Sequence, residues 1–250
     1  ANVAMGYHAL GQDTLGSRSV AIGDSALYSQ NFTTATNSYN VAVGADAGLL
    51  VTTGVENTLI GGLAGDAITT GYYNTALGKD ALSTNVLSSL NVAIGHSALK
   101  TLSSGNGEHH NVAVGANAGL SVTTGIQNTL IGGVAGDALT VGVRNVAVGF
   151  AALSSDDVGS RSTAIGYQAL NAQNFTTATN GYNVAVGYDA GKSITTGAGN
   201  IVIGYDCGDE LTTGGDNVLI GYGAGHSLVE GTKNVAVGYL TLDGGDEDSA

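Results

Sequence analysis

The amino-acid sequence predicts an all-β protein, a parallel β-solenoid (β-roll) of about fourteen coils with 17 residues each. A short motif, Asn or Ser followed by small and β-branched residues and then Gly, begins fourteen times, and ten of the thirteen intervals are 17 residues. The chain also contains 41 Gly, no Pro and no Trp, a composition that suits thin coils with tight turns. Because no apolar stripe of helical spacing survives so many Gly residues, helices are excluded.

Each coil has the same anatomy when the initial Asn or Ser is counted as position 1. Positions 2 to 4, typically V-A-V, predict a short strand whose side chains at positions 2 and 4 point inward. Position 5 is Gly in all fourteen coils, which predicts a bend with positive φ or a close backbone approach. Position 8 is Ala in twelve coils and Cys207 in one, which predicts a narrow inward-facing slot. We expect a second strand over positions 11 to 14, followed by a closing turn.

Asn at position 1 predicts a ladder in which side-chain amides hydrogen-bond from coil to coil. The predicted ladder consists of Asn40, Asn57, Asn74, Asn91, Asn111, Asn128, Asn145, Asn183, Asn200, Asn217 and Asn234.

A longer period is superimposed on the coils, because every fourth coil carries three or four extra residues. These long coils start at Ser19, Asn91 and Ser162. The predicted loop insertions are residues 29–37, 101–109 and 172–180. We expect them to bulge outward from one edge, because the 17-residue frame resumes after each. Residues 1–250 thus form a single repeat region, which we interpret as a fragment of a longer fibre.

Charge and motifs exclude several classes of function. The net charge of -13 argues against nucleic acid and anionic membrane surfaces as partners. No apolar run of about 18 residues occurs, so membrane insertion is not expected. The sequence has no nucleophile elbow, phosphate loop or His-x-x-x-His pair. We therefore predict no enzyme activity, no catalytic residues, no cofactor and no metal site.

Two features of the sequence are weaker candidates for a metal site. His109 and His110 are adjacent, and neighbouring strand residues face opposite ways, so one chain cannot easily direct both to one ion. We interpret this pair as part of an exposed polar loop. Segments 61–68 and 132–139 are similar to a calcium-binding nonapeptide, but they lack its third Gly and its period. We predict no calcium site there.

Position 6 is aromatic in six successive coils, and this set is called the aromatic file. Its members are Phe150, Tyr167, Tyr188, Tyr205, Tyr222 and Tyr239. The file could bind glycans by stacking sugars on ring faces, or it could form an inter-chain contact. Both interpretations remain open at the level of sequence.

Thr pairs form a second surface array, which raises the possibility of an ice-binding solenoid. They occur at residues 52–53, 69–70, 123–124, 195–196 and 212–213. Thr also simply suits strands. The array is interrupted at residues 13–15, 85–87 and 157–158, whereas an ice-binding surface usually needs a long unbroken array.

The repeat resembles known surface fibres. The motif N-V-A-V-G, for example at 40–44 and 111–115, resembles the head repeat of trimeric autotransporter adhesins, although that repeat is typically shorter than 17 residues. The pattern N-V-A-V-G-Y-D-A-G-K-S-I-T-T-G at 183–197 is similar to repeats in bacteriophage tail fibres. The resemblance implies a homotrimer around one axis, contacts with neighbouring fibre segments, and an extracellular location on a virion tail fibre or cell-surface appendage.

These observations together predict a non-catalytic structural fibre segment that supports host or surface attachment. The alternatives are a bacterial adhesin head and an ice-binding solenoid. Solenoid ends expose unpaired strand edges and normally need caps, and the sequence offers no amphipathic capping element. We therefore expect that the isolated chain is not a stable monomer.

Overall fold

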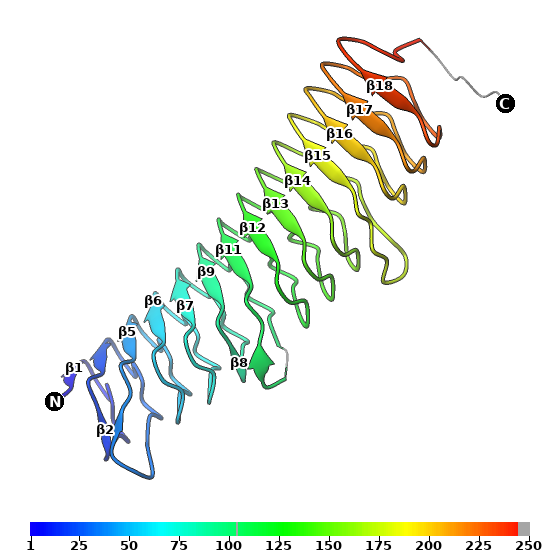
Figure 1. Ribbon diagram of the computed structural model, residues 1–250. Coiled ribbons are helices and arrows are strands. Elements are labelled where there is room, and N and C mark those ends of the chain that lie inside the picture. The colour runs from blue at the N-terminus through cyan, green and yellow to red at the C-terminus, as the bar shows by residue number, and fades with distance from the viewer. Residues whose placement is uncertain (104, 245–250) are drawn as a thin grey trace. The chain divides into compact units, whose positions relative to one another are not determined.

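The computed structural model describes residues 1–103 and 105–244, and over these residues it is a parallel β-solenoid without helices (Figure 1). The predicted fold class is confirmed. The chain divides into two compact units, residues 1–127 (unit 1) and residues 128–250 (unit 2). Each coil contributes one three-residue strand at the predicted place, and neighbouring strands pair in parallel within each unit.

Unit 1 stacks its main strands so that equivalent residues lie opposite one another, as Val41 lies opposite Thr58. These strands are β1 (Val3–Met5), β3 (Val20–Ile22), β5 (Val41–Val43), β6 (Thr58–Ile60), β7 (Thr75–Leu77), β9 (Val92–Ile94) and β11 (Val112–Val114). Two pairs of two-residue strands flank this stack. They are β2 (Gly16–Ser17) with β4 (Thr36–Asn37), and β8 (Ser88–Ser89) with β10 (Gly107–Glu108).

Unit 2 repeats the same arrangement, and Val184 lies opposite Ile201 in the same register. Its strands are β12 (Thr129–Ile131), β13 (Val146–Val148), β14 (Thr163–Ile165), β15 (Val184–Val186), β16 (Ile201–Ile203), β17 (Val218–Ile220) and β18 (Val235–Val237).

The direction of the strand side chains is opposite to the prediction. In β5, Ala42 at position 3 is fully buried, whereas Val41 and Val43 at positions 2 and 4 are half-buried. The buried residue of position 1 explains this, because Asn40 points into the coil and strand side chains alternate. Positions 2 and 4 must then point outward. The interior is filled instead by positions 3, 8 and 12, which are Leu59, Ala64 and Ile68 in one coil.

The predicted second strand over positions 11 to 14 is also wrong. In the coil of Asn40 these residues, 50–53, form turns and bends. Asp46 and Gly48, which precede this segment, have φ of 56° and 61°. Such left-handed residues interrupt an extended backbone. Hydrogen bonds between coils nevertheless continue, as from Thr52 N to Thr69 O at 2.9 Å. The backbone is therefore satisfied without a regular second sheet.

The Gly at position 5 behaves as predicted. Gly61 has a φ of 132°, and a Cβ built on it would lie 2.6 Å from the backbone carbonyl of Gly78 in the next coil. Gly187 has a φ of 143°, and its Cβ would lie 2.1 Å from the oxygen of Gly204. These glycines serve both a left-handed bend and a close backbone approach.

Each insertion keeps some of its residues in the core and exposes others. In the first insertion Gln30 and Phe32 are buried, whereas residues 33–35 are exposed. Gln173 and Phe175 are the buried equivalents in unit 2. In the remaining insertion Leu102 and His109 are buried, and residue 104 lies outside the described residues. Buried side chains thus anchor each insertion. The prediction that residues 29–37, 101–109 and 172–180 bulge outward is therefore wrong for part of each insertion, which lies in the core.

Cys207 occupies the small slot of position 8, where it is fully buried, and its Sγ lies 3.2 Å from the carbonyl oxygens of Leu219 and Ala224. Burial raises the pKa of its thiol to about 11. A thiolate is the reactive form, so we expect native protein to react with a thiol reagent at pH 8 on the order of 100-fold more slowly than urea-unfolded protein. Similar rates for native and unfolded protein would contradict this placement.

Candidate functional site

The outward side chains of positions 2 and 4 form a surface that we call the outer face. In unit 2 its fourteen side chains comprise twelve Val or Ile and two Thr, and none is charged. Ile131, Ile165 and Ile201 are each 38% exposed. The seven main strands of unit 1 likewise present twelve apolar side chains and two Thr. An uncharged apolar surface of this kind is typical of an interaction site.

The aromatic file runs along one edge of the outer face in unit 2. Its neighbouring rings lie 5.0 to 5.7 Å apart between centroids, with interplanar angles of 7° to 19°. The side chains are between 40% (Tyr167) and 72% (Tyr239) exposed. Because the rings cover each other's faces, the file offers ring edges and hydroxyls. Sugar stacking on ring faces would be restricted to the two ends of the file, an arrangement that favours the inter-chain interpretation.

Carboxylates flank the aromatic file at position 7. Asp189 and Asp206 follow Tyr188 and Tyr205 directly, and Lys192 Nζ lies 3.0 Å from Asp189 Oδ2. This hydrogen bond raises the pKa of Lys192. The Asp206 carboxylate is the main cause of the raised pKa of Tyr205. The Asp206 carboxylate therefore acts on the Tyr205 hydroxyl of the file, whereas the charge of Asp189 is offset by Lys192.

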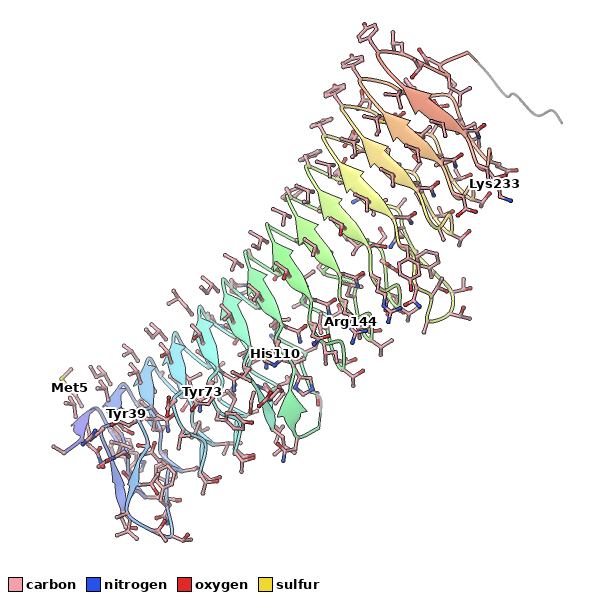
Figure 2. All side chains as sticks on the ribbon, viewed as in Figure 1. Met5, Tyr39, Tyr73, His110, Arg144 and Lys233 are labelled. Carbon is pink, nitrogen blue, oxygen red and sulfur yellow. The ribbon has the colours of Figure 1, made fainter. Side chains whose placement is uncertain are left out.

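The opposite edge of the outer face carries position 17, the residue just before each Asn or Ser. Figure 2 labels two of these residues in unit 2, Arg144 ahead of β13 and Lys233 ahead of β18. Between them, Arg161 Nη1 donates a hydrogen bond of 2.7 Å to Tyr182 Oη, and the Arg161 Cζ lies 5.7 Å from the centroid of that ring. In unit 2 this edge therefore carries three cationic side chains and Tyr182, together with one carboxylate, Asp216.

The Asn ladder lies inside the coils and is structural. Asn57 Nδ2 donates to Gly71 O at 2.9 Å in its own coil, and Asn57 Oδ1 accepts from Asn74 N at 3.0 Å in the next coil. Of the eleven predicted members, ten are at most 1% exposed, and Asn234 is half-buried. The side chains thus satisfy backbone groups both within and between coils and are not available to a ligand.

The His pair is split by the fold. His110 is exposed as predicted, with Nε2 3.6 Å from Glu108 Oε2. His109 is buried, which corrects the prediction of an exposed loop, and its Nδ1 lies 2.9 Å from Gly107 O. It occupies position 16, which is also buried at Ser38 in the first long coil but is only half-buried in most ordinary coils, as at Val55. Burial lowers the pKa of His109. Among the residues that the structure describes, no group of three His, Cys, Asp or Glu could hold a metal ion.

Some hydroxyl groups of the Thr pairs form hydrogen bonds within the solenoid. Thr52 Oγ1 donates to Thr69 O at 3.2 Å, and Thr212 Oγ1 donates to Val229 O at 3.0 Å. The first Thr of such a pair therefore links coils, whereas the second, such as Thr196, is exposed. This use of hydroxyl groups weakens the ice-binding alternative, because an ice-binding array needs both files facing water.

Sequence reasoning missed a buried polar cluster beneath the insertion of unit 2. Asp156 is fully buried, its Oδ1 accepts from Gly159 N at 3.0 Å, and its Oδ2 accepts from Gln173 Nε2 at 2.6 Å. Burial raises the pKa of the Asp156 carboxyl. The available signal was the replacement of apolar position 12 by Asp and Gln in consecutive coils. Asp156 and Gln173 are both fully buried, and we assign the cluster a role in anchoring the insertion.

No family model, no curated protein and no solved structure matches this chain. Across residues 1–103 and 105–244, no helix is long and apolar enough to cross a membrane.

Proposed function

We propose that this chain is a non-catalytic structural segment of an extracellular fibre, the shaft or head of a phage tail fibre or a similar surface appendage. It assembles as a parallel homotrimer through the outer face and supports attachment to a host or surface. The observation that carries the proposal is the absence of any charged residue at positions 2 and 4 of the fourteen main strands that the structure describes. In a chain of net charge -13, an apolar face of this regularity fits contact with another protein surface.

The mechanical role follows from the bonding of the coils. Backbone hydrogen bonds link the coils, and the Asn ladder and Thr hydroxyls add further links between many of them, for example from Thr195 Oγ1 to Thr212 O at 3.3 Å. Such links run along the stacking direction and resist separation of the coils. Three chains sharing an axis would bury the outer faces, which adds the apolar burial that a thin coil lacks. The product is a stiff spacer that holds a binding region away from its base.

Mass photometry or sedimentation of the 24.6 kDa chain tests the assembly, and we expect a species of three chains. Replacing Val148 and Val186 by Asp should release monomers that retain β-sheet circular dichroism, because both side chains point outward. The control Thr196→Asp changes an exposed residue away from the outer face and should leave the trimer intact. A well-behaved wild-type monomer would refute the trimer, and thermal hysteresis in that monomer would favour the ice-binding alternative.

A further inference from the structure

The two edges of the outer face carry opposite charge. Position 17 holds four of the seven Lys and Arg residues of the chain, and only two carboxylates, Glu56 and Asp216. Its four cations are Arg18, Arg144, Arg161 and Lys233. The other edge, positions 6 and 7, holds five carboxylates and one cation, Lys79. Its carboxylates are Asp24, Asp46, Asp80, Asp189 and Asp206. In a strongly acidic chain, a cationic edge opposite an acidic edge is a pattern that self-association can use.

Symmetry determines which edges meet. When parallel copies close around an axis along the stacking direction, the position-17 edge of each copy meets the position-6 edge of its neighbour. When two copies pack face to face in antiparallel orientation, like edges meet, and carboxylates would face carboxylates. The distribution of charge therefore favours the parallel ring over the antiparallel pair.

The aromatic file supplies a suitable partner for the cations. Its ring faces are covered by stacking, so its hydroxyls and edges remain, next to Asp189 and Asp206. The chain already contains the contact in question, because Arg161 donates to the Tyr182 hydroxyl at 2.7 Å and lies over that ring. Arg18 contacts Tyr39 in the same way in unit 1, with Cζ 5.3 Å from the ring centroid. Guanidinium groups pair well with both tyrosine and carboxylate.

We infer that neighbouring copies of unit 2 contact one another edge to edge, with the position-17 residues of one copy against the aromatic file and flanking carboxylates of the next. The inference rests on the proposed function, since it specifies how the homotrimer is held. It assigns the aromatic file to assembly and not to a glycan, and it gives the three chains one direction and one register.

Disulfide trapping in the full chain tests this contact, with the native thiol removed by Cys207→Ala. The double variant Asp216→Cys, Tyr222→Cys places one thiol on each edge of the outer face, at the two ends of the same strand, β17. The two positions lie at opposite ends of β17, and residues 217–220 between them already span roughly 10 Å, beyond the 4.4–6.8 Å Cα separation of a disulfide, so only an inter-chain bond can form. Pairing Asp216→Cys with Tyr205→Cys or Tyr239→Cys covers a register offset by one coil in either direction.

We expect one of these three pairs to give a covalent species of three chains on a non-reducing gel, which collapses to single chains with reductant. Asp216→Cys paired with Thr196→Cys, which lies away from the outer face, is the control and should give none. If the protein has the mass of three chains but none of the three cysteine pairs forms a cross-link, the edge contact is wrong, whereas the proposed function is not contradicted. Dimers formed by Tyr222→Cys alone would show that like edges meet and would also overturn it. A monomer by mass would remove the proposed trimer itself.

Discussion

Gly61→Ala is expected to destabilise the protein by about 3–5 kcal/mol, whereas Gly62→Ala should change its stability by less than about 0.5 kcal/mol. Gly61 has a φ of 132°, a region that is essentially restricted to Gly, and its Cβ would lie 2.6 Å from the backbone of Gly78. At Gly62 the nearest heavy atom to the added Cβ is Ala45 O at 3.9 Å, an ordinary contact. The two substitutions are chemically identical and adjacent in sequence, so they separate backbone geometry from composition.

Thermal unfolding followed by circular dichroism, at one fixed protein concentration, measures the difference. We expect Gly61→Ala to lower the Tm by about 10 °C and Gly62→Ala to lower it by about 1 °C or less. The fixed concentration matters because assembly contributes to apparent stability. Equal effects of the two substitutions would show that the position-5 bend is not the constraint that the structure assigns to it.

The fold class was predictable because the period of the sequence equals the length of one coil of the solenoid. Each repeat of 17 residues becomes one coil, and the Gly at position 5 fixes the same bend in every coil. The inward direction of position 3 could also have been derived. Side chains alternate along a strand, so a buried Asn at position 1 places the side chain of position 3 inside the coil. The Asn residues, and not the β-branched residues, therefore determine which strand side chains point inward.

Other features could not be predicted because they depend on backbone and side-chain conformation and not on residue type. The left-handed residues at position 7, such as Asp46 (φ 56°), prevent a regular second sheet, yet no single residue type marks that position. The buried bases of the insertions depend on which residues re-enter the core, and position 16 does not decide this, because it is buried at His109 but only half-buried at Val55. The aromatic file was visible in the sequence, but only the ring stacking decides that its faces are covered.

The Asn ladder should be similarly intolerant of change. Asn57→Ala removes the acceptor of the Asn74 N–H and the donor to Gly71 O, and it leaves both backbone groups buried. Leaving such groups unsatisfied costs about 2–4 kcal/mol in total. The control Asn174→Ala removes an exposed side chain and should change the free energy of unfolding by less than about 0.5 kcal/mol. Urea unfolding of the three proteins provides the comparison, and equal midpoints would contradict a structural role for the ladder.

Asn57→Asp is the sharper test because it keeps the shape and changes only the hydrogen-bonding groups. The substituted oxygen would face Gly71 O, which Asn57 Nδ2 now contacts at 2.9 Å, and Asn40 Oδ1, now at 3.3 Å. A buried carboxylate among acceptors has a raised pKa, so the folded state favours its protonated form. The free energy of unfolding of Asn57→Asp should therefore be lowest at neutral pH, where it should be below that of Asn57→Ala. It should rise relative to that of the wild type as the pH falls through the raised pKa. Urea midpoints at pH 7 and pH 4 measure this. A variant that unfolds at the same midpoint as Asn57→Ala at both pH values would mean that the amide nitrogen does not donate into the coil.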